Sequence, residues 1–341
     1  MINWLLKLTD EQRKAVLDEA EQASGILPKA LEKDWWVTLV LKALFQSDYA
    51  KHMVFKGGTS LSKGWKLIAR FSEDIDIALD PRAFGMEYKE APSKNYVDKL
   101  KKEGCKFTST VFMEELTKQL AALGLPMASV TIEAAPVPED RPDTDPQTIF
   151  VKYVSLYEAD KTNEYIEPVV KIEVSARSTM IPAEPVEIQS LLHEINPRTV
   201  YAETPFLVDA VAPRKTFLEK AFLLHEEFGK PDKEKIRSNR MSRHLYDLHK
   251  IKNTTLADEA LADTGLYNHL MQHRERYMRI SWVDYSSLQR ETISFVPIAE
   301  VVEAYRADYK TMQEQMIYEE NSPSFDELIS SLEDLLQKFR T

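Results

Sequence analysis

The chain has 341 residues, of which 43% are hydrophobic, so it is long enough for two domains that each bury a core. Its formal net charge of −11 argues against a general nucleic-acid coat protein, which would be basic, although an enzyme could still hold RNA with a local basic patch. Cys105 is its one cysteine, which excludes an intrachain disulfide and favours a reducing compartment.

The N-terminal part of the chain predicts two helices. Residues 1–7 lack the basic start and apolar core of a signal peptide, and no apolar run is long enough to span a membrane. We therefore expect a cytoplasmic protein without a membrane partner. The spacing of Thr9 and Gln12 predicts a capping box at the start of the first helix. A second helix is expected over about 28–45. Its Asp34 is ambiguous, and a carboxylate on the helix surface is the commoner explanation.

A glycine turn is the first feature of the chain that suggests chemistry. Gly57 and Gly58 precede Thr59 and Ser60, and residues 60–69 have the pattern of one short amphipathic helix. Adjacent glycines let the backbone approach a ligand, and a helix N-terminus offers N–H donors and the positive end of the helix dipole. Phosphate binds well at such a place. The sequence therefore predicts a phosphate-binding turn at these four residues.

Residues 72–79 follow with the periodicity of a strand. Polar and apolar residues alternate from Asp74 onward, so Asp74 and Asp76 are expected on the same face. Two carboxylates beside a phosphate-binding turn are what metal-dependent nucleotidyl transfer requires, with Mg²⁺ or Mn²⁺ as the ion. We expect the triphosphate of an NTP to lie near the glycine turn and Ser72.

A third carboxylate fits this scheme. Residues 168–175 alternate as a second strand, and Lys171 and Glu173 share its polar face. If this strand pairs beside the strand of Asp74, Glu173 completes a three-carboxylate site, which can hold two metal ions about 3.5–4 Å apart. Lys171 would then lie near the phosphates.

Each of these patterns alone is more often structural than functional. A glycine pair is usually a turn, Asp-x-Asp on a strand is usually a solvated face, and a Lys-x-Glu strand is usually a sheet edge. Their order and spacing together favour the functional interpretation. A Walker P-loop is excluded, because no Gly-Lys-Ser/Thr follows at the required spacing.

The C-terminal part is predicted to be helical. Residues 182–205 contain four prolines and are expected to form an irregular connector, which we take as the domain boundary. The predicted fold is α+β: a mixed-sheet nucleotidyltransferase core with N-terminal helices at 1–200 and a helical domain at 201–341. Helices are expected over 216–228 and 241–251, and Ser324 starts the last helix with a capping box.

Residues 230–250 are the best candidate for a local basic patch. Their basic residues are Lys230, Lys233, Lys235, Arg237, Arg240, Arg243 and Lys250. Such a patch could hold RNA phosphates, but a solvated helix face explains the same pattern and is slightly favoured. The seven histidines have no metal-ligand spacing, so no zinc site is expected.

The order of these motifs resembles the DNA polymerase beta nucleotidyltransferase superfamily and, more closely, the AbiEii/AbiGii toxin family. The resemblance covers about residues 30–250 and is carried by residues 32–41, 55–61, 70–76, 218–221 and 243–248. The chain departs from the family pattern at His244, where the family more often has aspartate. No role is therefore carried over onto position 244.

The resemblance implies the toxin of a type IV toxin–antitoxin or abortive-infection system. It implies transfer of a nucleotide to RNA, with the 3′ end of tRNA as the first candidate acceptor and protein acceptors left open. It also implies a cognate antitoxin, a DNA-binding regulator encoded nearby. Lys220 and Asp247 match the family's helical motifs and are implied as accessory residues that bind the nucleotide.

Two other functions remain open from the sequence. A glycosyltransferase also uses Asp-x-Asp with a divalent ion, but it gives no reason for the glycine turn or the Lys-x-Glu strand. A non-catalytic module that binds GTP or ATP is the other alternative. The presence of Asp74, Asp76 and Glu173 together argues against it.

Overall fold

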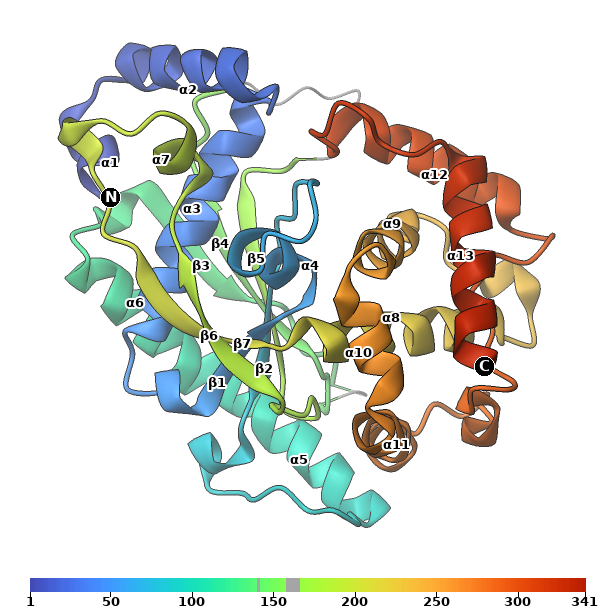
Figure 1. The fold of residues 1–341 in the computed structure, drawn as a ribbon. Coiled ribbons are helices and arrows are strands. Elements are labelled where there is room, and N and C mark those ends of the chain that lie inside the picture. Colours follow the sequence, from blue (N-terminus) through green and yellow to red (C-terminus); the bar gives the residue numbers. More distant parts are fainter. Residues whose placement is uncertain (140–141, 158–165) are drawn as a thin grey trace. The chain divides into compact units, whose positions relative to one another are not determined.

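The computed structural model describes residues 1–139, 142–157 and 166–341, and the chain divides into two compact units (Figure 1). The first unit comprises Met1–Gly64, Phe71–Lys89 and Ser93–Val211. The second comprises Trp65–Arg70, Glu90–Pro92 and Ala212–Thr341. The chain therefore passes through the second unit between the glycine turn and Asp74. The boundary expected at residues 200 and 201 stays a prediction.

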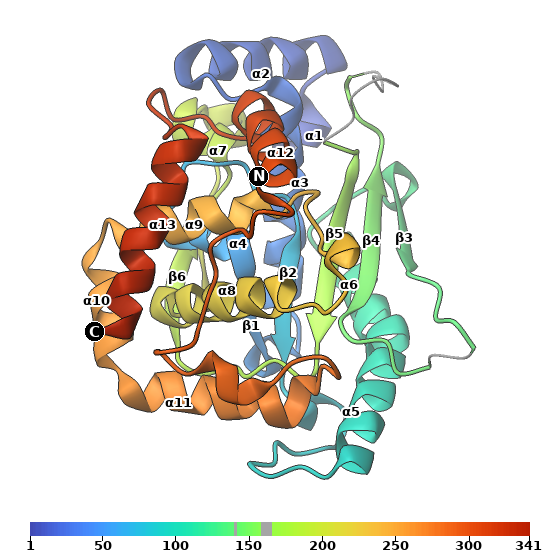
Figure 2. The same ribbon diagram turned by 90° about the vertical axis from the view of Figure 1, so that its right-hand side faces the viewer.

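Seven strands in the described residues of the first unit form one mixed sheet (Figures 1 and 2). In chain order they are β1 (Met53–Lys56), β2 (Ile75–Leu79), β3 (Val130–Ala134), β4 (Gln147–Tyr153), β5 (Val169–Ser175), β6 (Ala183–Ile188) and β7 (Phe206–Val211). Their order across the sheet is β3-β4-β5-β2-β1-β7-β6. The pairs β2–β5 and β1–β7 are parallel, and the other neighbours are antiparallel. The mixed sheet confirms the predicted α+β class.

The helices of the first unit include one that is long and largely buried. They are α1 (Asn3–Lys7), α2 (Asp10–Ser24), α3 (Pro28–Phe45), α4 (Gly57–Thr59), α5 (Lys94–Phe107), α6 (Met113–Ala122) and α7 (Leu191–Ile195). The predicted capping box of Thr9 and Gln12 is present at the start of α2. Helix α3 contacts α2, α6, α7 and β5. Asp34 on α3 is only 2% exposed, so its interpretation as a surface carboxylate was wrong.

The expectation of an irregular connector over 182–205 was also wrong. Strand β6 pairs antiparallel with β7, and α7 follows it. Pro185 lies within β6, at the edge of the sheet. Proline is tolerated on an edge strand because one side of that strand needs no N–H donor for the sheet. Pro185 thus belongs to an edge strand, whereas Pro182, Pro197 and Pro205 lie outside the strands and helices.

The second unit is helical. Its helices are α8 (Pro213–Phe228), α9 (Ser242–Lys252), α10 (Thr255–Ala262), α11 (Thr264–His273), α12 (Val302–Gln315) and α13 (Phe325–Arg340). Helix α8 packs against α9, α10 and α11, and α9 also contacts α12 and α13. The predicted capping box at Ser324 is present. Within the described residues, every helix is too short or too polar to cross a membrane.

Candidate functional site

The glycine turn follows β1 directly. Helix α4 begins at Gly57 and continues as a π-helical turn over Ser60–Gly64. The helix expected over 60–69 is therefore wrong in its bounds, because it starts earlier and ends before Lys66, which has a φ of 54°. Gly57 has a φ of 79°, in the left-handed region that favours glycine.

The backbone of Gly57 lies against the carboxylate of Asp76. A Cβ atom at Gly57 would be 2.0 Å from Asp76 Oδ2 and 2.8 Å from its Cγ. A phosphate bound at the start of this turn would therefore lie beside a carboxylate of the same charge. Such an arrangement is favourable only with a cation nearby, and carboxylate and phosphate oxygens are the ligands that Mg²⁺ prefers. The donors at this turn thus fit a divalent ion.

Charged residues form a row across three neighbouring strands. Lys56 on β1 is the register partner of Asp76 on β2, and Asp76 is the register partner of Glu173 on β5. Cross-strand partners project from the same face of a sheet, so these three side chains share one face. The predicted pairing of the two acidic strands is confirmed. The sequence did not predict Lys56 as a member of this row, because a lysine at a strand end carries no local signal beyond its place before the glycines.

Hydroxyl groups join the glycine turn to the segment before β2. Strand β2 begins only at Ile75, so Asp74 lies just ahead of it. The Thr59 hydroxyl is hydrogen-bonded to the Asp74 carbonyl oxygen and lies 2.9 Å from Ser72 Oγ. The Ser60 hydroxyl donates to the Gly57 carbonyl at 2.9 Å. Both Thr59 and Ser60 are buried, so we expect this turn to offer backbone N–H groups, not hydroxyls, to a phosphate.

The predicted three-carboxylate metal centre stays a prediction. In residues 1–139, 142–157 and 166–341, no three His, Cys, Asp or Glu side chains are grouped as a metal site. Asp76 and Glu173 are neighbours by strand register, and Asp74 is two residues from Asp76. Lys171 Nζ lies 3.5 Å from Glu167 Oε2, in a pair whose side chains are 31% and 52% exposed. Exposed pairs of this kind are weak, so Lys171 can exchange partners.

Lys220 and Asp247 lie together in the second unit, inside a buried ion cluster. Arg70 donates to both oxygens of Asp247, from Nε at 2.7 Å and Nη2 at 2.8 Å. Lys220 Nζ is 2.9 Å from Asp247 Oδ2 and 3.2 Å from His244 Nδ1. The nucleotide contact implied for Lys220 and Asp247 stays a prediction, and their observed partners are one another, Arg70 and His244.

Burial controls the protonation of this cluster. Burial alone would raise the pKa of Asp247, but the charges of Arg70 and Lys220 hold that pKa well below its usual range. Burial lowers the pKa of Lys220, and Asp247 opposes this shift. Burial and the charge of Lys220 hold the pKa of His244 well below its usual value. His244 is therefore neutral at pH 7.

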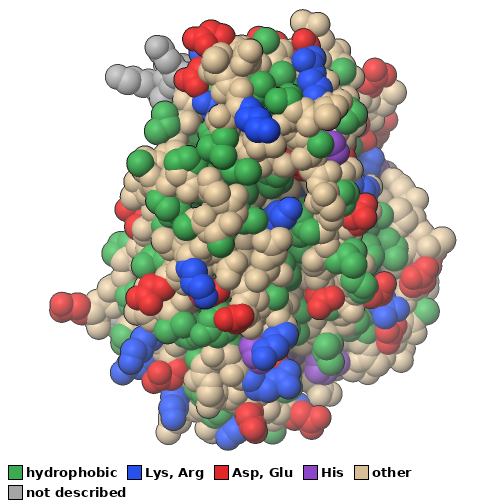
Figure 3. All heavy atoms as spheres, turned by 90° about the vertical axis from the view of Figure 1, so that its left-hand side faces the viewer, with side chains coloured by type: hydrophobic (Ala, Val, Ile, Leu, Met, Phe, Trp, Pro, Cys, Tyr) green, Lys and Arg blue, Asp and Glu red, His purple; other side chains and the backbone are tan. Residues whose placement is uncertain are grey.

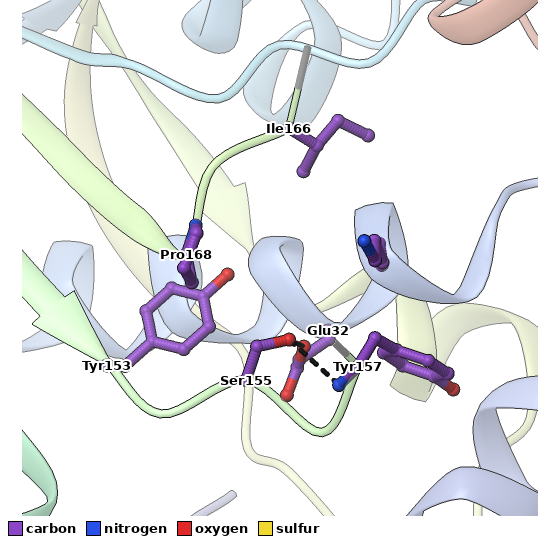
Figure 4. A pocket seen from close by; sticks show the side chains of 7 residues that line it. Glu32, Tyr153, Ser155, Tyr157, Ile166 and Pro168 are labelled. Carbon is purple, nitrogen blue, oxygen red and sulfur yellow. Dashed lines mark hydrogen bonds between the residues drawn. The ribbon is translucent and has the colours of Figure 1, made fainter. Parts of the chain in front are cut away.

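A separate cavity lies in the first unit (Figure 4). Its volume is about 150 Å³, and it is lined by Lys29, Glu32, Tyr153, Ser155, Tyr157, Ile166 and Pro168. Glu32 accepts hydrogen bonds from Ser155 Oγ at 2.6 Å and from the Leu156 N–H at 2.8 Å. Burial raises the pKa of Glu32. The lining residues are distinct from the glycine turn and from the charged row of Lys56, Asp76 and Glu173.

The predicted basic patch in the second unit is largely neutralised by its own neighbours. Lys230 and Arg237 both pair with Glu227, Lys235 pairs with Asp232, and Lys250 pairs with Glu319. On the face of the molecule drawn in Figure 3, which is not the evidence for this patch, Lys and Arg side chains lie among Asp and Glu side chains. A strong basic field at residues 230–250 is therefore not supported by these contacts.

The close approach of Gly57 to Asp76 predicts the effect of a substitution at the glycine turn. We expect Gly57→Ala to lose NTP binding and transfer, because the new Cβ collides with the Asp76 carboxylate. Gly85 has a φ of 75° and no atom within 4 Å of a Cβ, so Gly85→Ala meets the same backbone strain without the collision. Both variants should lose about 1–2 kcal/mol of unfolding free energy from that strain. Equal NTP binding in the two variants, measured by calorimetry, would contradict the role of the Gly57–Asp76 contact.

The chain is similar to a known family and to two solved structures. The family "Nucleotidyl transferase AbiEii toxin, Type IV TA system" matches residues 39–331. The crystal structure of JHP933 from Helicobacter pylori is 17% identical, with a TM-score of 0.44 over 92% of this chain and 93% of that one. A second H. pylori structure, described as a candidate nucleotidyltransferase, is 17% identical, with a TM-score of 0.42 over 91% and 94%. No curated protein matches. Because the family match covers most of its length, the chain belongs to the AbiEii family of nucleotidyltransferase toxins.

Proposed function

We propose that the protein transfers a nucleoside monophosphate from an NTP to RNA, with Mg²⁺ or Mn²⁺ as the cofactor. The observation that carries this proposal is the contact of the Gly57 backbone with the Asp76 carboxylate, in a row with Lys56 and Glu173. This arrangement supports the proposal, because it would bring the proposed phosphate-binding turn and the proposed metal-binding carboxylates together at one point of the sheet.

The side chains of the first unit have distinct roles in this mechanism. The N–H groups at the start of the glycine turn bind the triphosphate, and Lys56 and Lys171 offset its negative charge. Asp74, Asp76 and Glu173 would hold the ion, which supplies charge neutralisation and activation of the acceptor hydroxyl. The acceptor hydroxyl loses its proton to solvent and its oxygen bonds to the α-phosphorus. The bond between the α-phosphorus and the oxygen that bridges to the β-phosphorus breaks, and pyrophosphate leaves with that electron pair.

The acceptor we propose is RNA, with the 3′ end of tRNA as the first candidate. The AbiEii family is one of type IV toxins, so we also propose a cognate antitoxin, a DNA-binding regulator encoded nearby. The basic residues of 230–250 could contribute to RNA binding only after exchanging their ion-pair partners. Lys220 and Asp247 are proposed as accessory residues of the same reaction.

Incubation with labelled nucleotides tests the proposal. The purified protein is mixed with each α-labelled NTP in turn, MgCl₂ or MnCl₂, and total RNA. We expect label in RNA and release of pyrophosphate with at least one NTP, and neither when EDTA removes the metal ion. NTP binding without incorporation would instead support a nucleotide-binding module. Incorporation of label into protein would change the acceptor and leave the nucleotide site in place.

A further inference from the structure

Three consecutive charged residues on α3 are buried and contact three different parts of the first unit. Glu32, Lys33 and Asp34 are 1%, 1% and 2% exposed. Successive helix residues point about 100° apart, so their side chains diverge. Charged residues are almost never this buried unless they are paired, and each of these three has partners. Their partners connect α3 to the segments that carry the proposed site.

Lys33 and Asp34 form ion pairs with two different segments of the proposed site. Lys33 Nζ lies 2.5 Å from Glu73 Oε2, and Glu73 directly precedes Asp74. Asp34 Oδ1 lies 2.6 Å from Lys63 Nζ, in the helical turn that begins at Gly57. One helix thus binds both the glycine turn and the residue next to the first aspartate.

Further contacts link α3 to other segments of the first unit. Asp34 Oδ2 accepts a hydrogen bond from the Leu191 N–H at 2.7 Å, which fixes the orientation of the carboxylate. Glu32 accepts from Ser155 and from the Leu156 N–H, just after β4. Helix α3 also packs against β5, the strand of Glu173. Each segment that carries a proposed site residue on β2, β5 or the glycine turn is therefore linked to α3.

Stability alone does not explain these ion pairs. Removing two charges from water costs several kcal/mol per ion, and well-packed apolar residues are often as stable as a buried pair. A buried pair does fix geometry, because its charges and hydrogen bonds tolerate few arrangements. Here the Lys33–Glu73 pair joins α3 to the segment that precedes Asp76. The Asp34–Lys63 pair joins α3 to the turn that begins at Gly57.

We propose that Lys33 and Asp34 are positioning residues, which act through Glu73 and Lys63 to hold the Asp74–Asp76 carboxylates against the glycine turn. The inference deepens the proposed function and rests on it for the reaction. The positioning itself is a property of the folded chain. It can therefore be measured without a metal ion, a nucleotide or turnover.

The test replaces whole ion pairs with apolar or neutral side chains of similar shape. The first variant is Lys33→Met/Glu73→Leu. The second is Asp34→Asn/Lys63→Met, in which the introduced amide oxygen can still accept from the Leu191 N–H. Each variant removes both charges of its ion pair, so both should fold with a Tm close to the wild-type value. The control is Lys152→Met/Glu133→Leu, which removes a pair whose side chains are 52% and 47% exposed in the same unit.

Two readouts decide the proposal. Hydrogen exchange should become at least about tenfold faster at residues 57–64 and 72–76 in both test variants, and should not change there in the control. The kcat for nucleotidyl transfer should fall about 10- to 100-fold, the range seen when groups that orient metal ligands are removed, with a smaller change in KM for the NTP. The control should keep wild-type kcat.

The outcomes separate this inference from the proposed function. If the double variants keep wild-type exchange rates at both segments, the positioning role is wrong, whatever the enzyme does. If the wild type itself transfers no nucleotide, the proposed function fails, while faster exchange in the variants still supports positioning. If a double variant has both the wild-type Tm and the wild-type kcat, its ion pair has only a structural role. If one variant fails to fold, the exchange rates of the other decide.

Discussion

The variant Asp76→Ala should lose nucleotidyl transfer by at least about 100-fold in kcat while remaining folded. Asp76 is the central member of the charged row and touches the backbone of Gly57, so its carboxylate is where phosphate and metal ion would meet. Its removal deletes charge that stabilises the transition state. The side chain is only partly buried, so the alanine leaves no deep cavity.

A matched control separates the loss of chemistry from the loss of fold. Asp209 is an exposed carboxylate on β7 of the same sheet, so Asp209→Ala should keep wild-type kcat and Tm. Labelled-NTP incorporation measures the first quantity, and thermal unfolding measures the second. Full activity of Asp76→Ala would remove Asp76 from the mechanism. A variant that does not fold would show that its role is structural.

The contact between Gly57 and Asp76 predicts a coupling between two variants. In the Asp76→Ala background, the Asp76 Oδ2 and Cγ atoms that a Cβ at position 57 would meet are gone. Gly57→Ala should therefore cost less unfolding free energy in that background than in the wild type, because residues in contact are not additive. The double variant should still be inactive.

The variant Asp247→Ala should destabilise the protein by about 3–5 kcal/mol. Its carboxylate is fully buried and accepts from Arg70 and Lys220, and its loss leaves two buried cations without their shared counter-charge. Denaturant unfolding followed by circular dichroism measures the loss. The control is Asp258→Ala on α10, which removes an exposed pair with Lys338 and should change the unfolding free energy by less than about 1 kcal/mol. Equal effects of the two variants would contradict the role given to the buried cluster.

The same cluster makes the wild-type protein sensitive to acid. The pKa of His244 is well below its usual value, so the unfolded chain binds that proton first as the pH falls below about 6.5. The pKa of Asp247 is also depressed, so its stabilisation is fully present above the unfolded pKa of about 4 and is lost as the pH falls further. The unfolding free energy should therefore decrease from about pH 6.5 downward, and Asp247→Ala should remove the contribution of Asp247 to the decrease below about pH 4.

Local sequence patterns predicted the strands of the site but not the register in which these strands pair. The polar and apolar alternation of residues 168–175 predicted β5 to within one residue of its observed bounds, because one face of the strand is more buried than the other. The register that brings Glu173 beside Asp76 had to be assumed, since residues so far apart in the chain leave no local signal. Lys56 joined the row only through that register.

The errors lie where distant contacts override local pattern. The helix expected over 60–69 stops at Gly64, where a Cβ would be 2.7 Å from Val186 Cγ2, and the chain then enters the second unit. Arg70 there pairs with Asp247, 177 residues away. The burial of Asp34 was missed for the same reason, because a charged residue on a helix indicates a surface until its partner Lys63 is known.

The most direct test of the central claim is a crystal structure with Mn²⁺ and an NTP analogue that cannot be cleaved at the α-phosphate. The account predicts anomalous Mn²⁺ density in contact with Asp76 and Glu173, and triphosphate oxygens on the N–H groups at the start of the Gly57 turn. Mn²⁺ and the triphosphate bound at another place, with the Asp76 carboxylate and the glycine turn free of both, would contradict it.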